Sequence, residues 1–366
     1  MTGLAAFFNF TPAGATLDDL DTPVPVIDLD IVECNIARWQ AHCDRHQLAN
    51  RPHIKTHKLA PLARAQIAAG ARGITVQKLG EAEVMADAGV ADMLLTYNVV
   101  GAAKLERLAA LAKRTDIAVT VDSAEAAGGI AHAGSKAGRA IRVLIECDTG
   151  MGRAGVQSPK AALELARTVH ETQGLALGGL MTYPRTGVRA EMAAFLEAAR
   201  DLFKRDGLPC GTISTGGTPE MWSAEGLSAV TEYRAGTYIY MDRSQIAAGA
   251  ATEADCAMTV LATVVSRPTS ARAILDAGSK SLTSDLLGLT GHGMVLGAPE
   301  AVVYALSEEH GFLDVSKMAV PPNIGDRVRV IPNHVCPAIN LFDQVIIARG
   351  PRVLGAARVD ARGKVA

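Results

Sequence analysis

From about residue 50 the sequence alternates short apolar runs with alanine-rich stretches of helical character. The eight runs with strand character are Pro52–Lys55, Ile74–Gln77, Met93–Asn98, Ala118–Asp122, Val143–Asp148, Leu180–Tyr183, Thr212–Thr215 and Tyr233–Tyr238. The longer runs are apolar on both faces, which is typical of parallel strands covered by helices. Eight strand–helix units over about 200 residues favour an α/β fold of the (β/α)8 type, a TIM-like barrel.

The helical stretches between these runs include Leu59–Ala69, Gly80–Ala88, Ala102–Lys113 and Pro159–Glu171. The last one has clear end signals, with Ser158 as N-cap, Pro159 at the first position and Gly174 just past the end. A doubly wound open sheet is the competing topology. The glycine-rich dinucleotide turn that this topology predicts after the first strand is absent.

The rhythm changes after about residue 255, where strands predominate and helical intervals become few. The expected strands are Cys256–Ser266, Ala271–Asp276, Gly293–Leu296, Arg327–Ile331 and Gln344–Arg349. Pro23–Leu29 is also strand-like and precedes the barrel pattern, so we expect it to pair with the later strands. The sequence therefore predicts an N-terminal segment 1–30 that joins the β domain, a barrel 31–254 and a C-terminal β domain 255–366.

The overall composition indicates a globular protein, with 49% hydrophobic and 20% charged residues. The formal net charge of −2 gives no indication of nucleic acid or an anionic membrane as partner. The N-terminus does not resemble a signal peptide, and no apolar stretch approaches the ~20 residues of a membrane span. The six cysteines have no paired spacing and are expected to be reduced, so we predict a soluble cytoplasmic protein.

Polar residues stand at the ends of the predicted strands, where barrels of this type place their active sites. They are Lys55, Gln77, Asn98, Asp122, Asp148, Tyr183, Ser214, Thr215, Thr237 and Tyr238. Partial desolvation of Lys55 would lower its pKa and free the amine for attack on an aldehyde, although most lysines are simply exposed. His53, Lys55 and His57 would face one side if their segment is extended.

Two glycine-containing segments, one after the seventh predicted strand and one within the eighth, stand where barrels often bind phosphate. Glycine lets backbone N–H groups approach a phosphate, and hydroxyl groups add donors. The residues concerned are Ser214, Thr215, Gly216, Gly217 and Thr218 in the first loop, and Arg234, Gly236, Thr237 and Tyr238 in the second. Arg153, on a glycine-rich loop after the fifth strand, could hold a phenolate or carboxylate; a surface arginine on a turn fits its spacing equally well.

His334 and Cys336 are candidate metal ligands in the β domain. On an extended chain their side chains would point the same way, and two protein ligands leave positions open for water or substrate. A thiolate favours zinc, and manganese remains an alternative. A lone His-x-Cys pair also arises by coincidence. The histidines at positions 42, 46, 132, 170 and 310 resemble helix-surface or loop residues, and we assign them no role.

Seven motifs in this order carry a family resemblance: RPHIKTHK, TVQKLGEAE, ECDTGMGRAGV, STGGT, RAGTYIYMD, ILDAGSK and PNHVCPAIN. The chain resembles the fold-type III pyridoxal-phosphate (PLP) enzymes, relatives of alanine racemase, and within them the D-threonine aldolase and D-serine dehydratase group. The resemblance runs from residue 21 to the C-terminus. It implies a PLP barrel, a C-terminal β domain, a homodimer and a small amino acid as substrate.

The resemblance also implies roles for individual residues. Lys55 would bind PLP covalently, and Arg153 would hold its phenolic oxygen, with Tyr183 near the ring. The phosphate would be bound by Gly216, Gly217, Thr218, Gly236 and Thr237, and we expect Gln77, Thr215 and Tyr238 to line the same site. His334 and Cys336 would bind a divalent ion, for which zinc, manganese and magnesium are the candidates.

Two departures from the family leave the reaction open. His334-Val335-Cys336 is typical of the D-serine dehydratase branch, and the neighbours of Tyr183 differ from those in familiar aldolases. The preferred prediction is an aldolase that cleaves D-3-hydroxy amino acids to glycine and an aldehyde, with His57 or metal-bound hydroxide as base. The alternatives are a dehydratase of D-serine or D-threo-3-hydroxyaspartate, which gives a 2-oxo acid and ammonia, and a non-catalytic PLP-binding protein.

Overall fold

The computed structural model describes residues 3–9 and 15–366; residues 1–2 and 10–14 of the predicted N-terminal segment lie outside the described part. The chain divides into two compact units. The β unit contains the described residues up to Arg38, then Thr56–Leu62 and Thr237–Gly363, and the barrel unit contains the remainder. These limits differ from the predicted boundaries after residues 30 and 254, because the chain changes unit within helix α1 (Leu29–Arg45) and soon after strand β9 (Glu232–Tyr233).

The barrel unit is built on eight parallel strands in the order β2-β9-β8-β7-β6-β5-β4-β3. Their bounds are Ala49–Asn50 (β2), Ile74–Val76 (β3), Asp92–Leu95 (β4), Asp116–Val121 (β5), Ile141–Cys147 (β6), Leu175–Thr182 (β7), Thr212–Thr215 (β8) and Glu232–Tyr233 (β9). A parallel bridge between His53 and Thr75 joins the region after β2 to β3. The predicted TIM-like α/β architecture is therefore confirmed.

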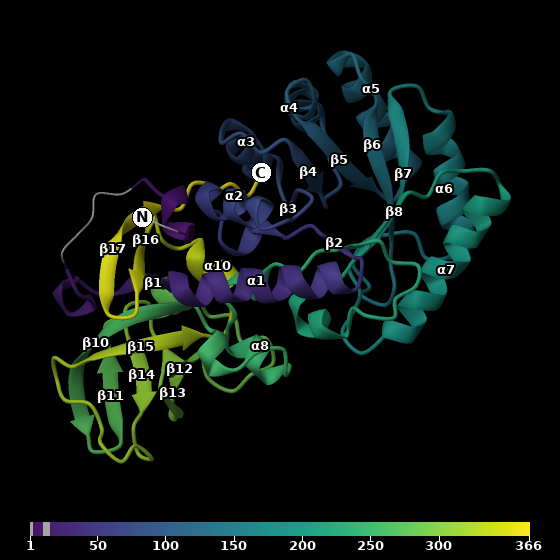
Figure 1. The fold of residues 1–366 in the computed structure, drawn as a ribbon. Helices are drawn as coiled ribbons and strands as arrows, with labels where there is room; N and C mark the ends of the chain where they lie inside the picture. Colours follow the sequence, from purple (N-terminus) through teal and green to yellow (C-terminus); the bar gives the residue numbers. More distant parts are fainter. Residues whose placement is uncertain (1–2, 10–14) are drawn as a thin grey trace. The chain divides into compact units, whose positions relative to one another are not determined.

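Helices follow the strands along the chain, and Figure 1 shows α3 to α7 succeeding one another around the outside of the sheet. They are α2 (Ala60–Ala68), α3 (Leu79–Asp87), α4 (Ala102–Ala112), α5 (Ala124–Ala137), α6 (Pro159–Glu171) and α7 (Arg189–Arg205). The sheet packs a buried cluster of Leu94, Ala118, Leu144 and Met181, one residue from each of four neighbouring strands. Apolar residues on both faces of the strands are thus explained by helices on one side and this cluster on the other.

The first and last predicted barrel strands are wrong in position. The predicted strand Pro52–Lys55 is replaced by β2 before it and by a 3-10 helix, η3, over Ile54–Thr56. The backbone N–H of Lys55 bonds the ring Nδ1 of His53 at 3.3 Å, a local bond that competes with strand pairing. His53, Lys55 and His57 therefore do not lie on an extended segment. Similarly, β9 ends at Tyr233 and a 3-10 helix, η5, covers Thr237–Ile239.

The β unit contains a nine-stranded sheet in the order β11-β14-β13-β12-β15-β10-β1-β16-β17, in which β11 also pairs with β10. The strands are Val24–Asp28 (β1), Met258–Thr269 (β10), Arg272–Leu275 (β11), Gly293–Val295 (β12), Ala298–Leu306 (β13), Gly311–Asp314 (β14), Arg327–Pro332 (β15), Gln344–Arg349 (β16) and Arg352–Arg358 (β17). Strand β1 is the segment predicted at Pro23–Leu29, and it pairs antiparallel with β10 and parallel with β16. The sequence did not predict β13, β14 or β17, whose residues are largely half-buried or exposed.

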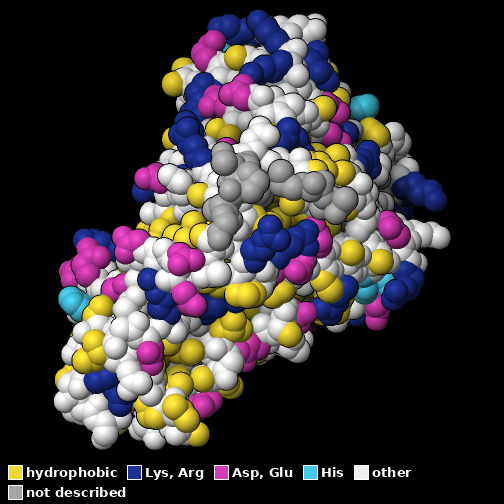
Figure 2. Space-filling view, turned by 60° about the vertical axis from the view of Figure 1, so that its left-hand side comes forward, with side chains coloured by type: hydrophobic (Ala, Val, Ile, Leu, Met, Phe, Trp, Pro, Cys, Tyr) yellow, Lys and Arg dark blue, Asp and Glu magenta, His cyan; other side chains and the backbone are white. Residues whose placement is uncertain are grey.

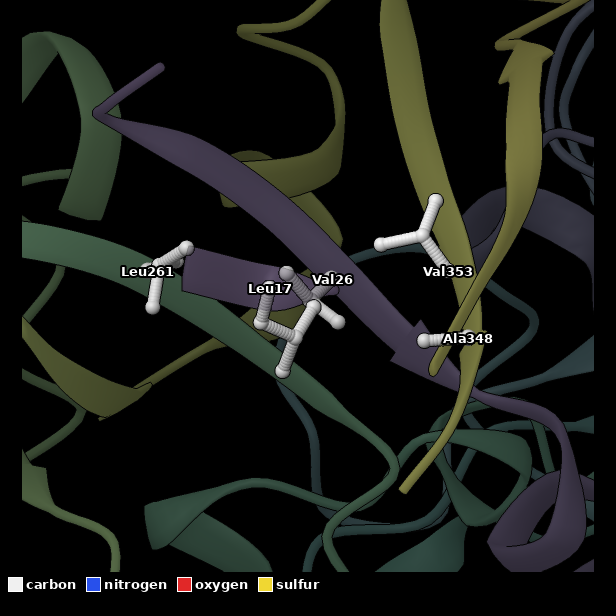
Figure 3. Close-up of a cluster of buried hydrophobic side chains, with 5 residues drawn as sticks. All are labelled: Leu17, Val26, Leu261, Ala348 and Val353. Atoms are coloured by element: carbon white, nitrogen blue, oxygen red, sulfur yellow. The ribbon is translucent and has the colours of Figure 1, made fainter. Parts of the chain in front are cut away.

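Side chains from segments far apart in the sequence form one core of the β unit. Figure 3 shows this cluster, which consists of Leu17, Val26, Leu261, Ala348 and Val353. The remaining helices of this unit are short: α8 (Arg243–Ala247), α9 (Ser279–Leu282), α10 (Val335–Ile339), η1 (Gly3–Phe7), η2 (Leu17–Asp19) and η6 (Glu253–Asp255). The 3-10 helix η4 (Thr218–Ser223) belongs to the barrel unit.

The mixed charges on the surface (Figure 2) agree with the small net charge of the chain. On the face drawn in Figure 2, Lys and Arg side chains are interspersed with Asp and Glu, so that face carries no single-sign field. Among the helices that the structure describes, none has both the length and the apolar character needed to cross a membrane.

Candidate active site

A lysine and an arginine side chain lie near one aromatic ring in the barrel unit. Lys55 lies in η3, after the first strand, and its Nζ is 6.0 Å from the ring centroid of Tyr183. The guanidinium carbon of Arg153 is 5.3 Å from the same centroid. Tyr183 directly follows β7, so the three side chains come from the carboxyl ends of different strands. The structure thus brings together three residues that the sequence singled out.

Gln77 links the region of Lys55 to the next strands. Its Oε1 lies 3.1 Å from Nε2 of His53, and its Nε2 donates to the carbonyl oxygen of Thr96 at 2.9 Å. Its backbone N–H donates to Oε2 of Glu81 at 2.8 Å. These bonds fix the Gln77 side chain and, through His53, the start of η3.

The glycine-rich loop that carries Arg153 is organised by one carboxylate. Oδ1 of Asp148 accepts the N–H groups of Gly150, Met151 and Gly152 at 3.0, 2.9 and 3.1 Å. Burial alone would raise the pKa of Asp148, but these donors outweigh it and hold the pKa below its usual value. Asp148 therefore shapes the loop.

A pocket of about 470 Å³ opens beside this loop. It is lined by Gln77, Thr96, Tyr97, Asn98, Val100, Lys104, Glu146, Arg153 and Ala154. The pocket therefore joins two sequence-predicted site residues, Gln77 and Arg153, and adds Lys104 as a second cation. Its size suits a small polar molecule.

The loop after β8 accepts only glycine at its first position. Gly216 has φ +99°, and a Cβ there would lie 2.3 Å from Cζ of Tyr233. A Cβ on Gly217 would lie 3.1 Å from Cε2 of Tyr183, so the loop passes close to the ring that Lys55 and Arg153 also approach. Among the described residues, none accepts a hydrogen bond from the backbone N–H of Gly216 or Gly217. The loop therefore offers free donors, as an anion site requires.

The other predicted phosphate-site residues are placed differently. Thr215 directs its hydroxyl to the sulfur of Met192 at 3.1 Å, and Thr218 is buried in η4. Gly236 ends the barrel unit, whereas Thr237 and Tyr238 belong to the β unit. Tyr238 is completely buried.

Arg234, which the sequence placed in the second candidate phosphate segment without a role of its own, is buried. It follows β9, and its Nη2 donates to the carbonyl oxygen of Thr182 at 2.6 Å. Its Nε has no partner among the described residues. Burial lowers the pKa of Arg234 to about 10, although Glu232 and Glu146 oppose this shift. The sequence feature that indicates a functional role for Arg234 is its position directly after a strand, at the start of the motif RAGTY.

His334 and Cys336 are neighbours in the β unit, but not for the predicted reason. The chain is not extended there: His334 is the N-cap of the short helix α10, and Cys336 lies in its first turn. Their side chains nevertheless share a hydrogen bond. Burial alone would lower the pKa of His334, but Cys336 and Asp285 raise it to about 9.

Two acidic residues that the sequence did not reveal support this pair. Oδ2 of Asp285 lies 2.7 Å from Nδ1 of His334. The buried carboxylate of Asp242 accepts the N–H of Val335, between the two candidate ligands, at 3.0 Å. Burial raises the pKa of Asp242 despite its hydrogen bonds to Ser244 and Val335. No local spacing connects either aspartate to His334, so only the fold shows their proximity.

His57 is completely buried in the β unit. Its Nδ1 accepts the backbone N–H of Leu59 at 3.0 Å. A neutral His57 in this arrangement carries its proton on Nε2. The ring therefore presents a proton donor at Nε2, whereas the predicted role for His57 is that of a base.

Two family models match the chain. The alanine racemase N-terminal domain matches residues 27–244, and the putative serine dehydratase domain matches residues 257–348. A D-threonine aldolase of Arthrobacter sp is 36% identical and covers 96% of this chain and 95% of its own length. A D-threo-3-hydroxyaspartate dehydratase of Delftia sp. (strain HT23) is also 36% identical and covers 88% of this chain and 92% of its own length.

Solved structures are similar over nearly the same length. The D-threonine aldolase from Filomicrobium marinum has a TM-score of 0.87 at 33% identity and covers 97% of this chain and 100% of its own. The Delftia dehydratase has a TM-score of 0.85 at 35% identity over 94% of this chain and 98% of its own. The chain therefore belongs to the alanine racemase-like, fold-type III PLP enzymes, in the group that contains the D-threonine aldolases and D-threo-3-hydroxyaspartate dehydratases.

Proposed function

We propose that this protein is a metal-activated, PLP-dependent lyase of D-3-hydroxy amino acids that cleaves its substrate, as a D-threonine aldolase does, to glycine and an aldehyde. The observation that carries the proposal is the placement of Lys55 and Arg153 near the same ring, that of Tyr183. An amine and a guanidinium beside one aromatic ring suit a planar, anionic aldehyde cofactor. The relatives named as D-threonine aldolases support the choice of reaction.

The barrel unit offers PLP a fitting set of groups. The orphaned Nε of buried Arg234 and the free N–H groups of Gly216 and Gly217 are donors without protein partners in the described chain. Lys55 would hold PLP covalently and Arg153 its phenolic oxygen. The other proposed contacts in this unit are Gln77, Tyr183, Thr215, Gly216, Gly217, Thr218 and Gly236. The family resemblance adds Thr237 and Tyr238. Bound PLP supplies an electron sink for charge that develops at the substrate's Cα.

The donor set in the β unit suits a divalent metal. An imidazole and a thiol on adjacent side chains, with Asp285 on the second ring nitrogen, match the ligands and outer support of zinc sites. His334 and Cys336 would be the ligands, and manganese and magnesium are the other candidates. Two solved structures of D-threo-3-hydroxyaspartate dehydratase carry a histidine-to-alanine and a cysteine-to-alanine substitution, the latter in a metal-free form. Their substituted positions are separated by one residue, as His334 and Cys336 are.

The chain's own residues would bind the substrate and handle its protons. Lys55 would hold or return a proton at Nζ, the atom that lies 6.0 Å from the ring centroid of Tyr183. Lys104 and Arg153 in the pocket would bind the substrate carboxylate by charge. The bound metal would polarise the substrate hydroxyl. His57 would exchange a proton at Nε2, because its Nδ1 is engaged by Leu59.

A dehydratase that gives a 2-oxo acid and ammonia is the second candidate, and the geometry of His57 favours it. Departure of hydroxide is assisted by a proton donor, and a neutral His57 carries its proton on Nε2. The Delftia dehydratase is as similar in sequence as the Arthrobacter aldolase. Under this alternative Lys55 would remove the Cα proton, whereas in the aldolase a base would remove the hydroxyl proton as the Cα–Cβ bond breaks and the aldehyde forms.

We also propose that the protein is a cytoplasmic homodimer. All six cysteines are free thiols, as expected in a reducing compartment. The homodimer follows from the family resemblance. For the chain itself we propose that residues 31–254 act as the cofactor domain, and that residues 1–30 and 255–366 act together as the metal domain.

Product analysis tests the function directly. Purified protein loaded with PLP and metal is incubated with D-threonine, D-serine and D-3-hydroxyaspartate, and the products are identified by mass spectrometry, with the L-enantiomers as controls. Glycine plus an aldehyde would support the aldolase. A 2-oxo acid plus ammonia would overturn it in favour of the dehydratase, and no turnover of any D-substrate would favour a non-catalytic PLP-binding protein.

A further inference from the structure

A second group of potential metal ligands lies in the barrel unit, where helix α1 ends. The N–H of His46 bonds the carbonyl oxygen of His42 at 3.2 Å, so the helical turn continues and both rings lie on one face. The two ring centroids are 4.6 Å apart. Oε2 of Glu225 lies 3.5 Å from Nε2 of His46. One ligand atom of each of these three residues lies within 4.8 Å of the other two.

The environment of His42 sets this group apart from a surface cluster. The sequence places His42 on a helix surface or loop, whereas the residue is 7% exposed. Its Nε2 is buried and has no partner among the described residues. The ring stacks on Trp39, with centroids 5.3 Å apart, and meets the edge of Trp222 at 5.5 Å. A buried imidazole nitrogen without a partner requires an explanation, and a bound ion supplies one.

We propose that His42, His46 and Glu225 form a zinc site. Metal binds the neutral form of imidazole, and the buried Nε2 of His42 has no partner among the described residues. Two histidines, one glutamate and a water make a common tetrahedral set for Zn²⁺. Ligand atoms around zinc lie about 3.4 Å apart, so the set must contract. Glu225, whose side chain is 55% exposed, is free to move inward.

The ion would connect two parts of the barrel unit. His42 and His46 belong to the end of α1, and Glu225 follows η4, which begins at Thr218 in the predicted phosphate loop. The carbonyl oxygen of Glu225 also accepts a hydrogen bond from Arg189 of α7. Zinc binding would thus stabilise the segment after the phosphate loop. The site shares no ligand with His334 and Cys336.

Tryptophan fluorescence gives a local readout for this site. The chain has two tryptophans, and both contact His42. Chelator-treated, PLP-loaded protein is titrated with Co²⁺, whose open d shell quenches nearby indoles. We expect saturable quenching with one ion per chain, and its reversal by Zn²⁺, which binds at the same ligands without quenching.

Variants decide whether the quenching ion sits here. His46→Gln and Glu225→Gln should each weaken the Co²⁺ affinity at least tenfold, because each removes one of three ligands. His170→Gln, at an exposed histidine of α6, should leave it unchanged. Cys336→Ser removes a proposed ligand of the catalytic metal and should retain the quenching. This result would show that the quenching ion does not sit at the proposed catalytic metal site.

Several results would overturn the zinc site. One is quenching that never saturates; another is unchanged affinity in both His46→Gln and Glu225→Gln. Loss of quenching in Cys336→Ser alone would assign the ion to the other site. Circular dichroism and the metal-free Tm should match the parent protein for every variant. Glu225 is exposed and outside helices and strands, so Glu225→Gln provides a folded variant even if His46→Gln does not.

Discussion

Nε of Arg51 lies 2.6 Å from Oε2 of Glu232, so a buried ion pair joins the end of β2 to its neighbour β9. Arg51 also bonds Asp92 at the start of β4 at 2.7 Å. Burial alone would lower the pKa of Arg51, but Glu232 and Asp92 more than offset this and raise it above its usual value. Arg51 therefore links the β2–β9 end of the sheet to β4, the strand next to β3 at the other end.

Replacement of Arg51 should be among the most destabilising changes in the barrel. Arg51→Met leaves Glu232, whose side chain is 1% exposed, as a buried carboxylate without its cation. We expect the free energy of unfolding to fall by about 3–5 kcal/mol, measured by urea denaturation.

Arg114→Met is the matched control for Arg51→Met. Arg114 pairs with Asp87 at 2.6 Å, but both side chains are about half exposed or more. Loss of an exposed pair costs about 0–1 kcal/mol. Equal effects of the two substitutions would contradict a structural role for the buried pair.

Lys55→Ala should abolish covalent attachment of PLP. The visible absorbance of the protein-bound cofactor should disappear, because no other amine is proposed to bind its aldehyde. In the parent protein, borohydride reduction followed by peptide mass spectrometry should place the added mass on Lys55. Lys160→Ala, at a strongly exposed lysine, is the control. An unchanged spectrum in Lys55→Ala would refute the role of Lys55.

Removal of the metal should separate catalysis from cofactor binding. The proposed metal ligands belong to the β unit, and Lys55 belongs to the barrel unit. Thorough chelation should therefore abolish turnover of D-3-hydroxy amino acids and leave the PLP absorbance intact. Added Zn²⁺ or Mn²⁺ should restore turnover, and activity that survives chelation would argue against a catalytic metal.

Features specified by local sequence could be predicted, as helix α6 illustrates. Its expected bounds, Pro159–Glu171, match the structure, and the Ser158 hydroxyl accepts the N–H of Ala161 at 3.1 Å as an N-cap. The strand–helix rhythm likewise predicted the parallel barrel, because each element carries its own pattern of apolar residues. The strand over Pro52–Lys55 was wrong because a side chain of the same segment, His53, bonds its backbone.

Contacts between distant segments could not be predicted. Asp285 is 49 residues from His334, and Arg234 is 52 residues from Thr182, whose carbonyl it bonds. No spacing rule connects such pairs, since the intervening loops set their separation. The roles of Lys55, Arg153 and His334 came from motif order, whereas the groups that hold these side chains in place became visible only in the folded chain.

Asp285 should position His334 for metal binding. Its Oδ2 lies 2.7 Å from Nδ1 of His334, so it holds the ring proton at Nδ1 and leaves Nε2 free for an ion. Asp285→Asn should weaken zinc affinity by about 10–100-fold, the usual effect of such outer partners. Competition with a chromophoric chelator measures the affinity, in a His46→Gln background so that only this site is counted.

A purely structural role for Asp285 makes a different prediction. If the carboxylate only stabilised the loop, Asp285→Asn would lower Tm and leave the zinc Kd unchanged. Orientation of the ring instead requires an acceptor at Nδ1, so Asp285→Glu should recover part of the affinity, because its carboxylate can still accept that proton. Asp343→Asn removes an exposed carboxylate of the same unit and serves as the control. It should leave the zinc Kd unchanged, and it should lower Tm only by the small effect of losing a surface ion pair with Arg362. Equal zinc Kd values in Asp285→Asn and Asp343→Asn would rule out orientation by Asp285.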